Sequence, residues 1–286
     1  MSIEVKHLTH TYSAGSALQS TAIRDVSLTI GEGEFVAIVG HTGSGKSTLV
    51  QHLNGLLTPT SGQVLVDGED MNGERVSKRL LRRKVGLVFQ YPEYQLFEET
   101  IAKDIAFGPK NLGLPADEID RRVRSAMAHV HLDYGKYAER SPFELSGGQM
   151  RRVAIAGVLA MEPRYLILDE PAAGLDPKGR DRILDMVKAL HAEGVTVVMV
   201  SHSMEDCARL ATRMIVMSQG TVVASDTPRA LFAQPELMDS VHLGIPASAR
   251  LCALLREKGL SLPHDLYTQE ELHDHILRLW KEAQHA

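Results

Sequence analysis

The sequence predicts an α/β fold with an antiparallel β annex, because its apolar residues follow two different patterns. Residues 35–39, 165–168 and 195–200 are short continuous apolar runs, which are typical of parallel strands covered on both faces. Residues 26–30 instead alternate apolar and polar side chains, and this period of two predicts a half-buried antiparallel strand. Helical patterns separate the apolar runs, so parallel strands are expected to alternate with helices.

Turn residues and leucine spacing predict the other elements of the core. Two hairpins are expected, at residues 64–68 and 215–223, because each segment contains a glycine turn between apolar residues. A helix is expected to carry the leucines that recur at helical spacing over residues 49–57, and to end before Pro59.

The middle of the chain is polar and mixed in charge, and it reads as mostly helical from about residue 75 to residue 142. Two breaks are predicted, at Gly108-Pro109 and at Gly113-Leu114-Pro115, because glycine and proline interrupt helices. We therefore expect a helical subdomain, inserted at about residues 90–160 into a domain that spans residues 1–226.

The remaining residues, 227–286, read as a C-terminal helical extension. Its last helix is predicted to open with the capping box Thr268-Gln269-Glu270-Glu271 and to carry Leu272, Ile276 and Leu279 on one face. The extension would either cover the core as a lid or form an oligomer contact, and the sequence leaves both open.

Composition limits the classes of protein. The chain has 286 residues, 44% of them apolar, which is enough for a large core. A net charge of -5 and a pI near 6.2 give no basic field, so no nucleic-acid partner is expected. Cys207 and Cys252 form no close pair in the sequence and are expected to be reduced thiols. The N-terminus has no secretory pattern, and the longest apolar run, residues 153–161, is about half of a membrane-spanning helix.

A phosphate-binding loop is predicted directly after residues 35–39, where the pattern G-x-x-x-x-G-K-S occurs. Its glycines let backbone amides wrap a β-phosphate at the positive end of the following helix. Lys46 would add a charge on the β- and γ-phosphates, and the Ser47 hydroxyl would be a ligand of Mg²⁺. ATP and Mg²⁺ are therefore the expected ligands; a glycine turn with a solvated lysine is the weaker alternative. The expected nucleotide-binding residues are Gly40, His41, Thr42, Gly43, Ser44, Gly45, Lys46, Ser47 and Thr48.

Two carboxylates, Asp169 and Glu170, end the apolar run 165–168 at the edge where such sheets bind ligands. Neighbouring carboxylates in an apolar setting are unfavourable unless a cation uses them. We expect Asp169 to hold Mg²⁺, through water, and Glu170 to take a proton from the attacking water. A helix N-cap would be the better interpretation of these residues alone, but not beside a phosphate loop.

A second glycine motif, Leu145-Ser146-Gly147-Gly148-Gln149, opens a helix that is expected to run to about residue 160. Two adjacent glycines at a helix start expose several amides and create a second anion site. One chain has no need of two γ-phosphate sites in separate places, so this motif would serve a nucleotide bound to another molecule. Read alone, it could be only a helix cap.

The two motifs, followed by the carboxylate pair, resemble the signature of ATP-binding cassette (ABC) ATPases. The resemblance extends over about residues 3–224 and implies a P-loop NTPase fold of the ABC type, with two ATP molecules sandwiched in a dimer. It implies further roles: Tyr12 would stack on adenine, Gln90 would reach Mg²⁺ and the attacking water, Asp176 would lie in the loop that crosses the dimer interface, and His202 would contact the γ-phosphate. An isolated tyrosine would more often be a packing residue.

A closer resemblance lies in residues 89–100 and 104–111, which read FQYPEYQLFEET and DIAFGPKN. They are similar to the ATPase subunits of energy-coupling factor (ECF) transporters, which import vitamins and some metal ions. The insertion Ser16-Ala17-Leu18 and residues 40–43 look most like the second ATPase of the heterodimeric group. The resemblance implies a sister ATPase, a transmembrane coupling subunit, exchangeable substrate-binding membrane subunits and a location on the cytoplasmic face of the cell membrane.

Other functions stay open at this point. The chain could serve another ABC importer, act as a soluble ABC ATPase on nucleic acid or ribosomes, or be a regulatory subunit without activity. Only 100 positions separate Lys46 from Ser146, which leaves no room for the long coiled coil of DNA-tethering relatives. Glu170 and His202 argue against an inactive subunit. The transported substrate is not encoded in this chain.

Overall fold

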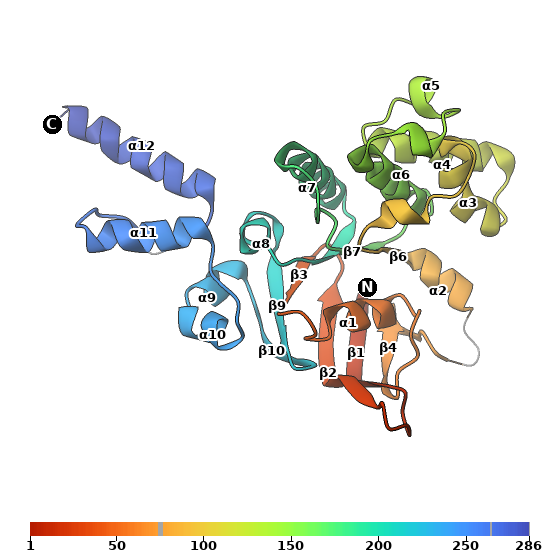
Figure 1. The fold of residues 1–286 in the computed structure, drawn as a ribbon, viewed down its shortest axis with the longest axis horizontal. Helices are drawn as coiled ribbons and strands as arrows, with labels where there is room; N and C mark the ends of the chain where they lie inside the picture. Colours follow the sequence, from red (N-terminus) through yellow and green to blue (C-terminus); the bar gives the residue numbers. More distant parts are fainter. Residues whose placement is uncertain (74–76, 264, 286) are drawn as a thin grey trace.

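The computed structural model describes residues 1–285 apart from 74–76 and 264, and it contains two β-sheets with helices around them (Figure 1). The larger sheet has the strand order β10-β9-β3-β8-β7-β6, and the smaller one the order β2-β1-β4-β5. The strands are β1 (Ser2–Tyr12), β2 (Ser20–Gly31), β3 (Phe35–Val39), β4 (Ser61–Val66), β5 (Glu69–Asp70), β6 (Val85–Val88), β7 (Tyr165–Asp169), β8 (Thr196–Val200), β9 (Arg213–Ser218) and β10 (Thr221–Asp226).

The helices cover the larger sheet and form the two ends of the molecule. They are α1 (Lys46–Leu53), α2 (Lys78–Lys84), α3 (Ile101–Asn111), α4 (Ala116–His129), α5 (Tyr134–Tyr137), α6 (Gly147–Leu159), α7 (Pro177–Ala192), α8 (Met204–Leu210), α9 (Pro228–Phe232), α10 (Pro235–Ser240), α11 (Ala247–Glu257) and α12 (Gln269–His285). Two short 3₁₀ turns, η1 (Pro92–Gln95) and η2 (Pro142–Glu144), lie beside the helices.

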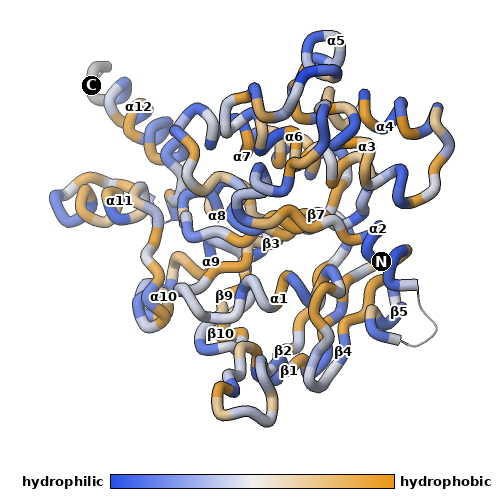
Figure 2. The backbone as a smooth tube through the Cα atoms, turned by 45° about the vertical axis from the view of Figure 1, so that its right-hand side comes forward, coloured by the Kyte–Doolittle hydropathy of each residue, from blue (hydrophilic) through white to orange (hydrophobic). Residues whose placement is uncertain are grey.

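The larger sheet confirms the predicted parallel strands. Every residue of β3, β7 and β8 is buried, and Figure 2 shows hydrophobic residues along β3 and β7 at the centre of the molecule. The strand pairs β3/β8, β8/β7, β7/β6 and β3/β9 are parallel, and only β10 is antiparallel to its neighbour. Helices on both faces explain the continuous apolar runs, because neither face of these strands meets water.

The smaller sheet is the antiparallel annex. Its strand β2 buries Val26 and Ile30 and pairs antiparallel with β1, as the alternating pattern predicted. The inner face of the annex packs with Leu49 and Leu53 of α1 and with residues of the larger sheet in one apolar cluster. The two predicted hairpins are present as β4–β5 and β9–β10. Helix α1, at the end of β3, is therefore held between the two sheets.

The predicted end of α1 was wrong, because the helix stops at Leu53 and does not continue to residue 57. The Asn54 side chain donates a hydrogen bond to the Val85 carbonyl, which draws the chain toward β6. Gly55 follows with φ 70, a left-handed conformation that ends helices. A Cβ at Gly55 would lie 2.7 Å from the Met71 side chain, so this close turn requires glycine.

The helical middle of the chain is confirmed with two corrections. Gly108-Pro109 does not break α3, because the helix continues through both residues to Asn111. The glycine instead allows α3 to approach α6, since a Cβ there would lie 2.9 Å from Met161. The parallel strand β6 also lies inside the region that was expected to be helical. The predicted start of that helical region, at about residue 75, is outside the described residues. The break at Gly113-Leu114-Pro115 separates α3 from α4, as predicted.

Arg151 of α6 fastens the helical layer to the sheet. Its side chain is 2% exposed and donates to both carboxylate oxygens of Glu93, at 2.9 and 2.7 Å. It also donates to the carbonyls of Pro171 and Ala173, at 3.2 and 2.6 Å, in the loop after β7. Burial alone raises the pKa of Glu93, but the hydrogen bonds and charge of Arg151 outweigh burial and hold that pKa below its ordinary range.

The C-terminal helices pack in two separate groups. Leu231 and Phe232 of α9 pack against buried residues of β9, whereas α11 and α12 pair through Cys252, Leu272 and their neighbours. Figure 1 shows α11 and α12 at the edge of the molecule farthest from α3–α6. The predicted capping box is present: Thr268 accepts from the Glu271 amide at 3.1 Å, and the Glu271 carboxylate accepts from the Thr268 amide at 3.0 Å. Among the described residues, no helix is long and apolar enough to cross a membrane.

Replacing Arg151 by Met should lower the free energy of unfolding by about 3 to 5 kcal/mol, because Glu93 would stay buried without its counter-charge. The midpoint of urea unfolding of the full chain measures this loss. The matched control is Arg140→Met, which removes an exposed pair with Glu144 and should cost less than about 1 kcal/mol. Equal shifts for the two variants would contradict the role given to Arg151.

Candidate active site

The phosphate loop lies between the end of β3 and the start of α1, and its glycines have specific reasons to be there. Gly45, the N-cap of α1, has φ 101, and a Cβ on it would lie 2.6 Å from the Ala22 carbonyl oxygen. A Cβ on Gly40 would lie 2.3 Å from the Met217 carbonyl oxygen. The strand β2 and the β9–β10 hairpin therefore press on the loop from outside, and only glycine permits its curvature.

The same loop has unused hydrogen-bond donors. In the described part of the chain, the backbone amides of Gly43, Gly45, Lys46 and Ser47 donate no hydrogen bond to another protein group. These amides lie at the N-terminus of α1, where the helix dipole favours an anion. The Lys46 ammonium is buried and donates to the carbonyls of Gly40 and His41, at 2.8 and 3.0 Å. This donor set fits a phosphate chain.

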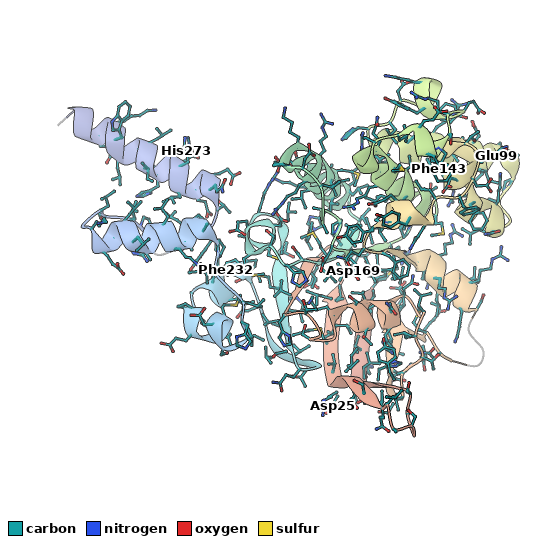
Figure 3. All side chains as sticks on the ribbon, viewed as in Figure 1. Asp25, Glu99, Phe143, Asp169, Phe232 and His273 are labelled. Carbon is teal, nitrogen blue, oxygen red and sulfur yellow. The ribbon has the colours of Figure 1, made fainter. Side chains whose placement is uncertain are left out.

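Burial acts on the charged groups beside the loop. It lowers the pKa of Lys46, although Glu170 and Asp169 act in the opposite direction. It raises the pKa of Asp169, against the hydrogen bond from the Ser47 hydroxyl and the charge of Lys46. Figure 3 places Asp169 in the centre of the molecule, above the antiparallel sheet. A cation beside Asp169 and an anion beside Lys46 would each relieve this penalty.

Glu170 is contacted by both of the other predicted catalytic side chains. The Gln90 Nε2 donates to one carboxylate oxygen of Glu170 at 2.8 Å, and the His202 Nε2 lies 2.6 Å from the other. The three residues follow the ends of β6, β7 and β8, which are adjacent strands. Glu170 has φ 51, a left-handed conformation uncommon for a side chain of this size. The structure thus brings together three residues that are far apart in the sequence.

The donor atoms around Asp169 suit Mg²⁺. Ser47 and Asp169 supply oxygen atoms, which magnesium prefers, and the Ser47 hydroxyl acts against burial on the pKa of Asp169. Gln90 uses its amide nitrogen on Glu170, which leaves the amide oxygen as its metal-binding atom. When bound, Mg²⁺ would neutralise charge on the phosphates. The predicted metal ligands therefore come from the phosphate loop, β7 and the residue after the β6 run.

Tyr12 lies at the end of β1, beside the start of α1. Its ring is 42% exposed, and its hydroxyl lies 3.2 Å from the Thr48 Oγ1. The two residues, both predicted to bind nucleotide, therefore border the phosphate loop on the same side. An exposed aromatic face next to the loop is available for a base, which packing alone does not require.

The second glycine motif is separate from the phosphate loop. In the part of the chain that the structure describes, no hydrogen bond joins residues 145–149 to residues 40–48. Ser146 is the N-cap of α6 and forms a capping box with Gln149, while Ser146 and Gly147 are exposed. Asp176, expected at a dimer interface, caps α7 by accepting from the Gly179 amide at 2.8 Å. The start of α6 is therefore exposed and separate from this chain's own phosphate loop.

Sequence reasoning missed one wall of a groove beside this site. The groove has a volume of about 810 Å³ and lies between β6, α2, α3 and α6. The segment of residues 89–100, which resembles the ECF ATPase subunits, supplies Leu96 and Phe97, and Tyr94 beside them is 84% exposed. The opposite wall includes Arg79, Arg82 and Arg83 of α2. No local pattern could reveal that these arginines face an aromatic segment.

The fold and this arrangement of phosphate loop, carboxylates and second glycine motif define a P-loop ATPase of the cassette type. The sequence profile of the ABC transporter family matches residues 23–173. Over 281 residues the chain is 54% identical to the energy-coupling factor transporter ATP-binding protein EcfA2 of Clostridium tetani, covering 98% of both chains. It is 55% identical to the protein of the same name from Symbiobacterium thermophilum, covering 95% of this chain and 94% of that protein.

Solved structures of ABC transporter cassettes are also similar to this chain. The structure of cbiO1 from Clostridium perfringens, part of the ABC transporter complex cbiONQ, matches with a TM-score of 0.74 and 37% identity over 89% of this chain and 98% of that one. A dimeric ATP-binding cassette in a post-hydrolysis state, bound to ADP and Pi, matches with a TM-score of 0.69 and 33% identity over 79% of this chain and 99% of that one. The chain belongs to the ABC transporter ATPases, in the group of the energy-coupling factor ATP-binding proteins.

Replacing Gly45 by Ala should weaken ATP binding at least about tenfold, because the new Cβ would press on the Ala22 carbonyl and the backbone would stay in a strained region. Isothermal titration of the full chain with Mg-ATP measures the change. Gly157→Ala in α6 is the matched control, since a Cβ there meets nothing within 4 Å. Unchanged affinity in the Gly45 variant would contradict the role of this close contact.

Proposed function

We propose that this chain is the ATP-hydrolysing subunit of an ECF-type importer, working in a dimer that encloses two ATP molecules. The observation that carries the proposal is the convergence of Gln90 and His202 on the Glu170 carboxylate, at 2.8 and 2.6 Å. An ATP-binding subunit without hydrolysis has no need of three such residues around one carboxylate. The membership in the ECF group supports the transport role.

The residues of the site suggest a division of labour. Lys46 and the free amides of the loop would hold the β- and γ-phosphates, and Ser47, Asp169 and Gln90 would hold Mg²⁺, which supplies charge neutralisation on the phosphates. Glu170 would accept a proton from the water that attacks the γ-phosphate. Gln90 and His202 each hold one oxygen of Glu170, and this fixes the direction in which the carboxylate faces. His202 would also contact the γ-phosphate.

A second subunit would complete each site. The exposed amides at the start of α6, with Ser146, Gly147, Gly148 and Gln149, form an anion site separate from this chain's own loop. They would bind the γ-phosphate of ATP held by the partner, and the partner's motif would close over the loop here. The similar ATP-binding cassette that forms a dimer supports a second ATPase as that partner, and the partner proposed here is a sister ATPase in a heterodimer.

The groove beside Gln90 offers a route from ATP to the membrane. Tyr91 follows Gln90 and stands 5.6 Å from the guanidinium of Arg151, while Tyr94 and Phe97 are exposed nearby. A movement of Gln90 on ATP binding would therefore reach the groove through one rigid segment. A transmembrane coupling subunit would dock there, on the cytoplasmic face of the cell membrane. Exchangeable substrate-binding membrane subunits would determine which vitamin or other micronutrient is imported.

Replacing Glu170 by Gln should abolish ATP turnover while leaving ATP binding within about twofold, because the amide keeps the shape of the carboxylate but takes up no proton. Turnover of the reconstituted complex and ATP binding by the chain measure the two effects, and gel filtration with ATP should reveal a trapped dimer. Glu236→Gln, on exposed α10, is the control and should keep full activity. Normal hydrolysis by the Glu170 variant would overturn the assignment of the base.

Affinity purification of the full chain from detergent-solubilised membranes of its host should recover a related ATPase and a polytopic membrane protein. We expect these partners because two surfaces are available to bind them, namely the exposed motif at the start of α6 and the groove. Mass spectrometry of the co-purified proteins identifies the partners. Recovery of ribosomes or DNA would favour the soluble ABC alternatives, and recovery of a different permease would favour another importer.

A further inference from the structure

Two buried histidines touch beneath the edge of the proposed ATP site. His10 on β1 is 8% exposed and His52 on α1 is 1% exposed. The His10 Nδ1 and the His52 Nε2 lie 3.2 Å apart, and the ring centroids are separated by 4.7 Å. The pair connects the antiparallel annex directly to the helix that follows the phosphate loop.

The hydrogen-bond partners fix the protons on this pair. The His52 Nδ1 lies 2.7 Å from the Thr48 carbonyl oxygen, which can only accept, so this nitrogen carries a proton. Burial lowers the pKa of His52, although the carbonyls of Thr48 and Thr58 act in the opposite direction, so the ring is neutral at pH 7. The His52 Nε2 is therefore an acceptor, and His10 donates to it from Nδ1. The hydrogen bonds therefore run in one direction, because His10 donates to His52 and His52 donates to the Thr48 carbonyl.

Tyr12 closes this chain of contacts into a ring of four residues. The His10 ring meets the Tyr12 ring edge to face, with centroids 4.5 Å apart and an interplanar angle of 79°. The Tyr12 hydroxyl lies 3.2 Å from the Thr48 Oγ1, and Thr48 also receives the hydrogen bond from His52. The tyrosine ring is thus contacted by the His10 ring, and its hydroxyl is contacted by Thr48.

Packing alone does not account for two histidines here. Their surroundings are apolar, with Leu49, Leu53 and Leu8 in the same layer, and aliphatic side chains would fill this space without polar atoms. In the described chain the buried His10 Nε2 has no hydrogen-bond partner, which is an unfavourable feature in a folded protein. A polar pair that costs stability in an apolar layer is expected where it orients a functional neighbour.

We propose that His10 and His52 are positioning residues that hold the Tyr12 ring in the orientation needed to stack on the adenine of ATP. The inference rests on the proposed function, in which Tyr12 carries the base. Among the described residues, no hydrogen bond joins either ring to the amides of the phosphate loop, to the Lys46 ammonium or to the Glu170 carboxylate. Loss of the pair should therefore weaken binding of ATP through the base, without changing the affinity of the loop for phosphates or the rate constant for hydrolysis.

The experiment compares ATP with tripolyphosphate, which has the phosphates but no base, by titration calorimetry of the full-length chain with Mg²⁺. Tyr12→Ala should weaken ATP binding about 5- to 100-fold. His10→Leu and His52→Leu should each weaken it about 3- to 10-fold. Tripolyphosphate affinity should stay within about twofold for all three, since the phosphate loop is intact.

Two further comparisons separate positioning from simple loosening of the fold. His10→Asn can place an N–H near the position of Nδ1 and should keep ATP affinity within about twofold. The side chain of His10→Gln is one methylene longer and places its amide beyond that position, so this variant should behave like His10→Leu. The matched control is His129→Leu, since the His129 Nδ1 lies 2.7 Å from the Ser125 carbonyl in the same helical arrangement but far from Tyr12 in the sequence. The control should leave ATP affinity unchanged.

A double variant completes the test. In a Tyr12→Ala background, His10→Leu should have no further effect on ATP affinity, because the ring that it positions is gone. Equal losses for ATP and tripolyphosphate, the same loss in both backgrounds, or no loss with His10→Leu would overturn the inference while leaving the base assignment of Tyr12 intact. If Tyr12→Ala itself binds ATP normally, the base assignment falls and this inference falls with it.

Discussion

The parallel pairing of β3, β8 and β7 is the constraint on which the site depends. Ile38 pairs with Val200, and Val200 pairs with Asp169, so the three strands end at the same level. The residues that follow these ends are the phosphate loop, His202 and Glu170. Because parallel strands deliver their carboxyl ends to one edge, a slip of one residue in one strand would move its functional side chain about 3.3 Å along the sheet. The apolar residues that bury these strands therefore also fix the positions of the polar residues that follow the strand ends.

The second constraint is the connection between this edge and the helical layer. Arg151 binds Glu93 on one side and the carbonyls after β7 on the other. Its guanidinium also lies over the Tyr91 ring, at 5.6 Å from the centroid. The start of α6, four residues earlier in the chain, carries the second glycine motif. The helix that carries the motif is therefore joined to the loop that follows Glu170 by the hydrogen bonds of this buried arginine.

Local patterns in the sequence were sufficient for most of the strands, the two hairpins, the glycine turn after β3 and the C-terminal capping box, because each depends on neighbours within a few residues. They did not predict β6, which lies in a region expected to be mostly helical. Contacts between distant segments decided the rest. Helix α1 ends early because Asn54 binds the Val85 carbonyl. Helix α3 continues through Pro109 and lies close to Met161 at Gly108. The roles of Gln90 and His202 came from a resemblance, since spacing alone does not bring them to Glu170. Neither Arg151 nor the pair of His10 and His52 carries a sequence signal, because their partners lie 20 to 58 and 42 residues away.

Burial prepares the site for its ligand. It lowers the pKa of Lys46 and raises the pKa of Asp169, which means that the protein alone destabilises both charged forms. The Lys46 ammonium donates hydrogen bonds to two carbonyls of its own loop, and these are weaker partners than phosphate oxygens. A nucleotide with its cation brings an anion to the lysine and a positive charge to the aspartate in one step. Folding has already removed water from both groups, so nucleotide binding does not have to supply this desolvation energy at the place where the reaction occurs.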